Sequence, residues 1–406
     1  MITKTIEQID KTDCTGCGLC ASKCPTACIS MAEDKEGFRF PKIDTAKCVN
    51  CGLCFNICPA TSAANKLYNK TDRRYFCGII KDSETLLKSS SGGVFGALAS
   101  YILSIGGYVC GCVYNDQLEA VHILSNKQEE IEKMYGSKYV QSRAENCFAE
   151  IKEHLKAGDT VMFTGTACQI AALRLYIGAE SPNLYCVEIL CHGVPSPGLF
   201  RQYKTYLEKK LKGTVKDIRF RDKRKGGWGC EHRMCVIYEK DGKEAELRPT
   251  LPAYFSSFFY GLNFRESCYQ CKFATSERVA DLTIGDFWGS WSKYGKRFNE
   301  GISVVGINSE KGQMLSDSIA DSFEFYEVLS ESEAIVSNDN FTHPIKRPVE
   351  RTDFYNGISE NGYKGLWKKA YLTKTYKKKT LASIYGAFVP AKIRFFIQKI
   401  KKKIAN

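Results

Sequence analysis

Apolar and polar positions along residues 74–211 follow the order strand, helix, strand. Short apolar runs such as YFCGII (75–80) and YVCGCVY (108–114) are typical of strands. Between them, SSSGGVFGALASYILSIGG (89–107) predicts an apolar helix that has a serine cap and ends at glycines. Alternating strands and helices favour a mainly parallel or mixed sheet covered by helices.

The same order recurs twice further along the chain. DTVMFTGTACQIAALRLYI (159–177) predicts a buried strand, a tight turn and a helix. LYCVEILCHGVPSPGLFRQYKTYLEKKL (184–211) predicts another strand and helix, with Ser196 and Pro197 at the N-cap and first helical position. Residues 215–238 then predict a strand, a basic glycine-rich loop and a second strand.

Two copies of one cysteine pattern, offset by 34 positions, stand near the N-terminus. Each copy is C-x2-C-x2-C-x3-C-P, the run that holds [4Fe-4S] clusters in two-cluster ferredoxins, where the fourth cysteine binds the other cluster. A zinc site or a chance cysteine-rich turn is the alternative. The pattern predicts one cluster on Cys14, Cys17, Cys20 and Cys58 and another on Cys48, Cys51, Cys54 and Cys24.

The net charge of +13 belongs to the end of the chain. Residues 364–406 hold thirteen Lys and Arg and no Asp or Glu, which leaves residues 1–363 neutral. The body therefore has no basic field for nucleic acid, and we expect no nucleic-acid partner. Residues 391–404 can form a helix with one apolar face, so the tail either contacts a membrane surface or acidic partner or is a solvated helix.

The first residues are polar and do not form a signal segment, and no apolar run reaches the roughly 18 residues that span a bilayer. Twenty cysteines in such a chain suggest reduced thiols that bind metal. We expect a cytoplasmic protein, which the basic tail could bring to the inner membrane surface.

Seven segments occur in the order SSSGGVF, GSKYVQS, GTACQIAAL, LCHGV, FRDKRKGGWG, CYQCKF and ADLTIGDFWG. This order resembles the coenzyme F420 hydrogenase/dehydrogenase beta-subunit family, here behind a two-[4Fe-4S] ferredoxin domain. The resemblance covers about residues 1–295. It implies an iron–sulfur flavoprotein that binds FAD. The first three segments are the implied walls of the FAD site, with Ser90, Ser91, Gly92, Gly93, Lys138, Tyr139, Gln141, Ser142, Thr164, Gly165 and Thr166.

The expected fold class is α/β (α+β overall): a bacterial-type ferredoxin domain, a mixed-sheet α/β flavin domain and a basic helical tail. We place the ferredoxin domain at residues 1–65 and the two parts of the flavin domain at 66–157 and 158–330. Residues 331–406 are expected to be a linker and the basic tail.

Four further cysteines are candidates for a third metal site. Cys168 and Cys191 each follow a predicted strand, and Cys268 and Cys271 form a CxxC pair. Strand ends of an α/β sheet converge on one crevice, so these thiols could hold a third [4Fe-4S] cluster, which is consistent with the resemblance. A zinc site, a redox-active dithiol and plain packing are the alternatives. We expect core packing for Cys28, Cys77, Cys110, Cys112, Cys147, Cys186, Cys230 and Cys235.

His192 and Lys223 are the candidate catalytic residues. His192 could relay a proton to flavin or substrate, or could be a structural histidine. Lys223 lies in the basic RFRDKR segment, which could hold an acidic substrate or the FAD phosphates, with Trp228 stacking, or could be a solvated hairpin. Asp286 and Trp288 could pack on the flavin site or serve packing alone.

These features predict an oxidoreductase that passes electrons between the clusters and FAD. The FAD would reduce or oxidise an organic substrate, either coenzyme F420 or another small molecule such as a cell-envelope sugar intermediate. Reduced ferredoxin or another redox protein is the expected partner. The alternative is a non-catalytic electron-transfer subunit of a larger redox complex.

Overall fold

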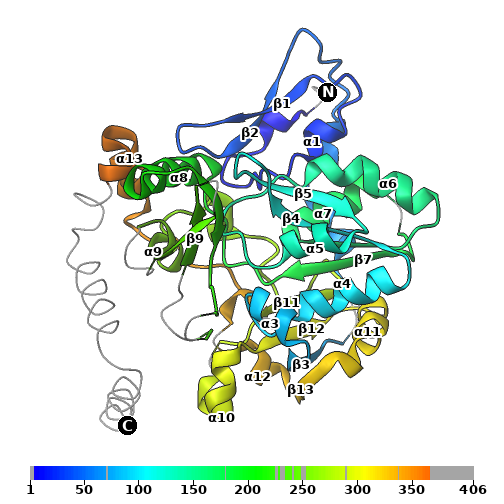
Figure 1. The fold of residues 1–406 in the computed structure, drawn as a ribbon. Coiled ribbons are helices and arrows are strands. Elements are labelled where there is room, and N and C mark those ends of the chain that lie inside the picture. The colour runs from blue at the N-terminus through cyan, green and yellow to red at the C-terminus, as the bar shows by residue number, and fades with distance from the viewer. Residues whose placement is uncertain are drawn as a thin grey trace, which may run out of the picture.

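The computed structural model describes residues 4–69, 72–178, 180–224, 227–228, 234–239, 242–247, 253–288, 290–336 and 338–365. Its largest element is an eight-stranded sheet in the order β13-β3-β12-β11-β7-β6-β4-β5 (Figure 1). The strands are β3 (Arg74–Ile80), β4 (Tyr108–Tyr114), β5 (Ala120–Ser125), β6 (Val161–Gly165), β7 (Leu184–Ile189), β11 (Leu282–Asp286), β12 (Ser303–Ile307) and β13 (Phe323–Leu329).

The centre of this sheet is parallel and its two sides are antiparallel. β4, β6, β7 and β11 run parallel to one another. β5 pairs antiparallel with β4, and on the other side β12 pairs with β11, β3 with β12, and β13 with β3, all antiparallel. The expectation of a mixed α/β sheet is thus confirmed, and the sheet draws strands from both expected parts of the flavin domain.

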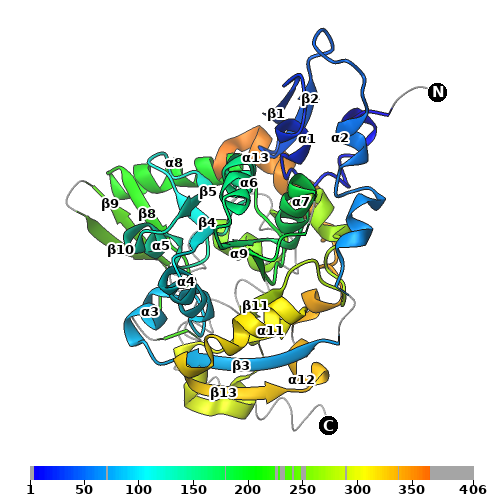
Figure 2. The same cartoon turned by 90° about the vertical axis from the view of Figure 1, so that its right-hand side faces the viewer.

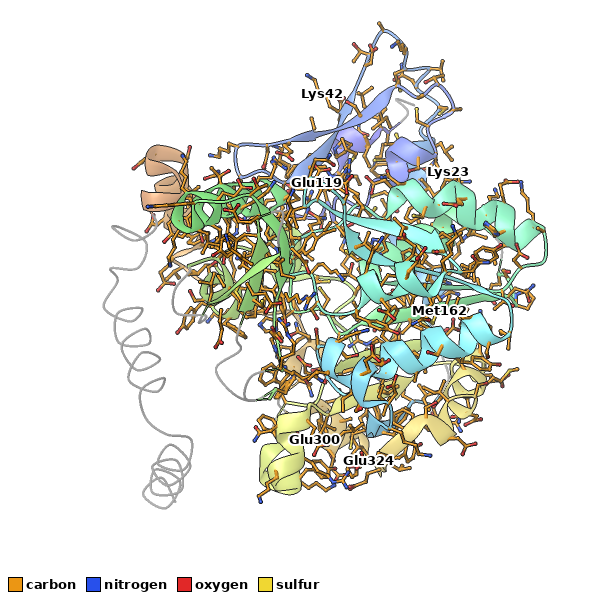
Figure 3. All side chains as sticks on the ribbon, in the orientation of Figure 1. Lys23, Lys42, Glu119, Met162, Glu300 and Glu324 are labelled. Atoms are coloured by element: carbon orange, nitrogen blue, oxygen red, sulfur yellow. The ribbon has the colours of Figure 1, made fainter. Side chains whose placement is uncertain are left out.

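Helices cover both faces of the sheet, and alternate side chains of β6 pack against the helices on opposite faces. Val161 and Phe163 pack with α6 and α7, whereas Met162 lies inside the molecule on the opposite face with α4, α5 and α11 (Figure 3). This is the two-residue alternation of a strand that is buried on both faces. The helices are α3 (Ser83–Lys88), α4 (Val94–Ser104), α5 (Gln128–Met134), α6 (Phe148–Lys156), α7 (Ala167–Ile177), α10 (Trp291–Tyr294), α11 (Glu310–Asp317) and α12 (Glu331–Ile335).

A smaller antiparallel sheet, in the order β10-β9-β8, packs with three helices around its own core. The predicted N-cap is present, because Ser196 Oγ accepts a hydrogen bond from the Leu199 N–H at 3.1 Å and Pro197 is the first residue of α8. The elements are β8 (Val215–Arg219), β9 (Met234–Tyr238), β10 (Lys243–Leu247), α8 (Pro197–Leu211), α9 (Ala253–Phe259) and α13 (Arg351–Gly365).

The N-terminal domain repeats one small unit, as the sequence repeat predicts. Its two short helices each start after a glycine in the left-handed conformation, Gly18 with φ 75° and Gly52 with φ 73°. The domain lies beside α6 and α7 (Figure 2). Its elements are α1 (Leu19–Ser22), β1 (Ile29–Glu33), β2 (Arg39–Ile43) and α2 (Leu53–Asn56).

Short 3-10 helices complete the described chain. None of the helices in the described ranges is long and apolar enough to cross a bilayer. The greater part of the basic tail, including the helix predicted at 391–404, lies outside the described residues. The 3-10 helices are η1 (Ile6–Gln8), η2 (Ser62–Leu67), η3 (Glu145–Cys147), η4 (Glu266–Gln270), η5 (Gly295–Glu300), η6 (Ala320–Ser322) and η7 (Asp339–Phe341).

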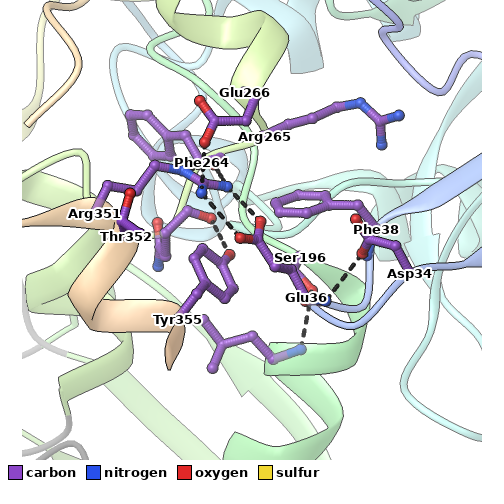
Figure 4. Close-up of polar contacts among 12 residues, drawn as sticks. Asp34, Glu36, Phe38, Ser196, Phe264, Arg265, Glu266, Arg351, Thr352 and Tyr355 are labelled. Atoms are coloured by element: carbon purple, nitrogen blue, oxygen red, sulfur yellow. Dashed lines mark hydrogen bonds and ion pairs between the residues drawn. The ribbon is translucent and has the colours of Figure 1, made fainter. Parts of the chain in front are cut away.

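Arg351 joins the N-terminal domain to the rest of the chain. Its side chain is 1% exposed and lies between Glu36, in the β1–β2 loop, and Glu266 (Figure 4). The guanidinium bonds both oxygens of Glu36, at 3.1 and 2.6 Å, and Glu266 Oε1 at 2.7 Å. It also donates to the Phe264 carbonyl oxygen from Nε and Nη2. One arginine thus connects the N-terminal domain, the CxxC segment and α13.

Gly37 permits a second close contact between the same domain and α8. Its φ is 79°, and a Cβ atom built on it would lie 2.5 Å from the Gly198 Cα. Gly106 is a matched reference, because its φ of 75° is nearly the same and a Cβ there would meet nothing within 4 Å.

We expect Gly37→Ala to destabilise the protein more than Gly106→Ala does. Both variants carry the cost of alanine in the left-handed region, about 1–2 kcal/mol. Only Gly37→Ala adds an overlap with backbone, worth about 1–3 kcal/mol more. Anaerobic thermal melting followed by circular dichroism measures the difference. Equal melting temperatures for the two variants would contradict the close contact.

Candidate functional site

A cavity of about 560 Å³ lies where the parallel strands β6, β7 and β11 end. The carboxyl ends of parallel strands are the usual place for a ligand in an α/β fold, and the volume suits a cofactor with a substrate. Ten of the residues expected in the FAD site line this one cavity: Ser90, Ser91, Gly93, Lys138, Tyr139, Gln141, Ser142, Thr164, Gly165 and Thr166.

Gly92, the remaining residue of that expected set, supports the wall from behind. Its N–H donates to Ser303 Oγ at 2.9 Å, and a Cβ atom there would lie 2.1 Å from the Gly78 carbonyl oxygen. Gly93 follows as the N-cap of α4 with φ 87°. The serine-glycine turn therefore brings the positive end of an eleven-residue helix to the cavity, which suits a phosphate group.

Hydrogen bonds join this turn to the GSKYVQS segment. Ser90 Oγ accepts from the Ser137 N–H at 2.7 Å. The Lys138 ammonium donates to the carbonyl oxygens of Lys133 and Tyr135, at 2.7 and 2.9 Å, near the end of α5. Burial lowers the pKa of Lys138 to about 8. Two segments that are far apart in sequence thus form one polar wall.

His192 lines the cavity and has a defined tautomer. Its Nδ1 lies 2.6 Å from Asn340 Oδ1, and because an amide oxygen only accepts, the proton of the neutral ring is on Nδ1. Burial lowers the pKa of His192, which favours this neutral form. Nε2 is then the nitrogen that can accept a proton or a hydrogen bond.

Lys223 does not line the cavity. It is buried, and its ammonium donates to the carbonyl oxygens of Ser91 at 2.7 Å and Glu300 at 3.0 Å. Burial lowers the pKa of Lys223 to about 7. The lysine therefore supports the serine-glycine turn from outside, and its catalytic role stays a prediction. Within the RFRDKR segment, Arg221 is the residue that lines the cavity.

His122 and Arg351 are residues that the sequence interpretation missed. His122 is buried in β5 and lines the cavity, with Nε2 at 2.9 Å from the Thr164 carbonyl oxygen. Burial lowers its pKa to about 4, so the ring is neutral. Its Nδ1 has no hydrogen-bond partner in the described part of the chain. In the sequence, the histidine within the apolar run AVHIL was the feature that could have indicated His122 as a site residue.

The four late cysteines converge beside the cavity. Burial, followed by the charges of other thiols in the group, raises the pKa of both Cys168 and Cys191. Burial and the charge of Cys271 raise the pKa of Cys268 to about 12. Charges act on one another in this way within a shared buried region. Cys168 and Cys191 also line the cavity, so the late cysteine group forms part of its wall.

The N-terminal cysteines gather in the two crossed sets that the sequence predicts. Burial and the charges of Cys17, Cys14 and Cys58 raise the pKa of Cys20. The second set shares a separate small hollow, lined by Cys24, Cys48, Cys51 and Cys54. The fourth cysteine of each run thus lies with the other run, as in two-cluster ferredoxins.

The first of these sets adjoins the late cysteines. Cys17 raises the pKa of Cys168 and packs against the same apolar core as Cys168 and Cys271. Arg265, 1% exposed, donates from Nε to the Cys14 carbonyl oxygen at 2.6 Å and from Nη1 to Gln141 Oε1 at 3.3 Å. These contacts hold the first cysteine set, the late cysteines and the cavity wall together.

In the described ranges, no group of three or more His, Cys, Asp or Glu has an arrangement that could hold a metal ion. A zinc ion binds all its thiolates at about 2.3 Å. A four-iron cluster needs a wider set of four thiolates, one for each iron. The cysteine-only chemistry of all three sets matches the ligands of such clusters.

The other cysteines mostly follow the packing interpretation. Cys112 differs, because it is half-buried and lines the cavity. Cys28 is buried, but its sulfur lies 3.3 Å from that of Cys24 in the second ligand set. Cys230 lies outside the described residues. The buried ones are Cys77, Cys110, Cys147, Cys186 and Cys235.

Comparison with known proteins places two sequence families on this chain. Residues 158–329 match the family described as the C terminus of the coenzyme F420 hydrogenase/dehydrogenase beta subunit. Residues 13–62 match the 4Fe-4S dicluster domain. These matches confirm the resemblance drawn from the sequence.

Among solved structures, a chain of the F420-reducing [NiFe] hydrogenase complex from Methanosarcina barkeri, studied by xenon derivatization, is similar to this chain. It shares 18% identity, with 76% of this chain and 94% of that chain covered, at a TM-score of 0.41. No curated protein matched significantly.

Proposed function

We propose that this chain is an iron–sulfur flavoprotein oxidoreductase. Its residues 158–329 match the C terminus of the coenzyme F420 hydrogenase/dehydrogenase beta subunit. Its residues 13–62 match the 4Fe-4S dicluster domain. One observation carries the proposal. Cys168 and Cys191 belong both to the wall of a cofactor-sized cavity and to a cysteine group that reaches Cys17 of the N-terminal domain. A row of redox sites would end at this cavity.

The chain's own residues fit FAD and a third cluster. The serine-glycine turn and the start of α4 would bind phosphate, and the carbonyl-bound Lys138 adds positive charge. Cys168, Cys191, Cys268 and Cys271 would hold the third [4Fe-4S] cluster. When bound, the clusters supply single electrons and the flavin supplies two-electron chemistry with an organic substrate.

His192 is the residue that we expect to hold a proton in the cavity. Asn340 fixes its Nδ1–H, which leaves Nε2 to accept a proton from the substrate side or to return it. The substrate is proposed to be coenzyme F420, which the family's name suggests, or another small organic molecule.

An external redox protein is the proposed electron partner. Cys51 is exposed in the second cysteine set, and the neighbouring Val49 side chain is 63% exposed. An apolar contact beside an exposed cluster ligand suits a transient redox complex. The beta-subunit family favours a second candidate function, in which this chain passes electrons to another subunit.

Anaerobic mixing with dithionite-reduced ferredoxin tests the proposed function. We expect the FAD absorbance to bleach in the isolated chain, without any further subunit. A chain that binds FAD but bleaches only when a second subunit is added would favour the electron-transfer role. A chain that binds no flavin would contradict the flavoenzyme.

A further inference from the structure

Arg221 is a buried cation in the wall of the cavity. It follows β8 with φ 60°, and its side chain is only 2% exposed. The guanidinium carbon lies 4.6 Å from the ring centre of Trp228 and 5.1 Å from that of Trp288. Contact with two indole rings fixes the plane of the guanidinium and keeps water away from its faces.

Only one side of this guanidinium is satisfied. Nη1 pairs with Asp286 Oδ2 at 3.2 Å and lies 3.5 Å from the Tyr139 hydroxyl. The Trp228 indole N–H donates a hydrogen bond to the other oxygen of Asp286 at 3.3 Å. Nε and Nη2 are buried and have no hydrogen-bond partner in the described part of the chain. A buried donor that is left without an acceptor is unfavourable.

The unpaired atoms form a recognition edge. Nε and Nη2 of arginine present two parallel N–H groups, a fork that matches two oxygens of a carboxylate or phosphate. Because Asp286 occupies Nη1, this second fork is the one left for a ligand. Arg221, Tyr139, Asp286 and Trp288 all line the cavity, which places this arginine in its wall.

Both cationic and acidic residues line the cavity. Lys138 lines the same cavity, and Lys223 is buried behind it on the Ser91 carbonyl oxygen. Asp286 and Asp339 are the acidic residues that line it, and Asp286 is already paired with Arg221. An incoming anion would therefore meet an arginine that has two donors without acceptors, in a wall that also holds Lys138.

We propose that the Nε–Nη2 edge of Arg221 is an oxyanion-binding site that takes a phosphate or carboxylate group from the cavity. Two sources share this chemistry: the diphosphate of the proposed FAD and an acidic group on the substrate. The proposal rests on the proposed function for the identity of the ligand. The site itself rests on the contacts of Arg221.

Calorimetric titration of the full chain tests this site. The probes are FAD and inorganic pyrophosphate with flavin-free protein, and inorganic phosphate with FAD-loaded protein. Arg221→Met removes the charge and keeps an apolar chain between the indoles, and Arg221→Lys keeps the charge without the fork. Arg219→Met is the matched control, since Arg219 pairs with Asp217 and does not line the cavity.

We expect Arg221→Met to weaken one of these bindings about ten- to a hundredfold, with a partial loss for Arg221→Lys and none for Arg219→Met. Loss of FAD and pyrophosphate affinity identifies the cofactor as the source of the oxyanion. Loss of phosphate affinity alone identifies the substrate. Wild-type affinity of Arg221→Met for all three probes, in a protein with normal iron content and melting temperature, would overturn the site.

The outcome separates this inference from the proposed function. A wild-type chain that binds no FAD, yet loses pyrophosphate affinity on Arg221→Met, would refute the flavoenzyme and leave the oxyanion site standing. A chain that binds FAD with the same affinity in every variant, and shows no phosphate binding in any of them, would refute the oxyanion site and leave the flavoenzyme standing.

Discussion

Cys271→Ala is expected to lower the iron content from about twelve to about eight atoms per chain, because the proposed third four-iron cluster loses a ligand. Cys271 belongs to the late cysteine group and raises the pKa of both Cys168 and Cys191. The eight N-terminal ligands are unchanged in this variant. Electrons from reduced ferredoxin should then no longer bleach the flavin. Iron analysis and anaerobic absorbance spectra measure both effects.

Cys77→Ala is the matched control for this prediction. Cys77 is equally a cysteine of the main body, but it is fully buried in β3, where its thiol lies 3.5 Å from the Tyr294 hydroxyl. We expect this variant to keep all its iron and to lose only packing energy, about 1 kcal/mol. Full iron content in Cys271→Ala would show that the CxxC pair serves another purpose.

Arg351→Met is expected to destabilise the chain by about 3 kcal/mol. The substitution leaves the carboxylates of Glu36 and Glu266 without their shared cation, and the Phe264 carbonyl oxygen without its donors. These groups connect the ferredoxin domain to the CxxC segment. We therefore expect a lower melting temperature together with slower reduction of the flavin through the N-terminal clusters.

Arg347→Met separates this effect from a general loss of positive charge. Arg347 also bonds Glu266, through Nε and Nη2 at 2.8 Å, but its side chain is 38% exposed. Exposed ion pairs contribute about 0–1 kcal/mol, so this variant should melt near the wild type. Similar melting temperatures for the two variants would show that Arg351 does not stabilise the contact between the domains.

Features that are local in sequence could be predicted. The β4 strand matches the run YVCGCVY, and Ser196 caps α8, because side-chain periodicity and capping act within a few residues. The crossed cysteine sets followed from a spacing that is typical of two-cluster ferredoxins. The serine-glycine turn and the GSKYVQS segment were placed at one site through the family resemblance.

Contacts between distant residues could not be predicted. Arg351 and Glu36 are 315 positions apart, and nothing near either residue indicates the other. Arg221 stood among several basic residues that looked alike in sequence. Its backbone conformation and two tryptophans turn it into the cavity, whereas Arg219 and Arg224 pair with neighbouring carboxylates. His122 reaches the cavity because β5 pairs with β4 at the edge of the sheet.

The most direct test of the central claim is the content of iron, acid-labile sulfide and flavin in the anaerobically purified chain. Three cysteine sets, of which the late set lies beside the cavity, predict about twelve irons, about twelve sulfides and about one FAD per chain. About eight irons with no flavin would contradict it, because the chain would then carry only the N-terminal clusters, with no redox cofactor in the cavity.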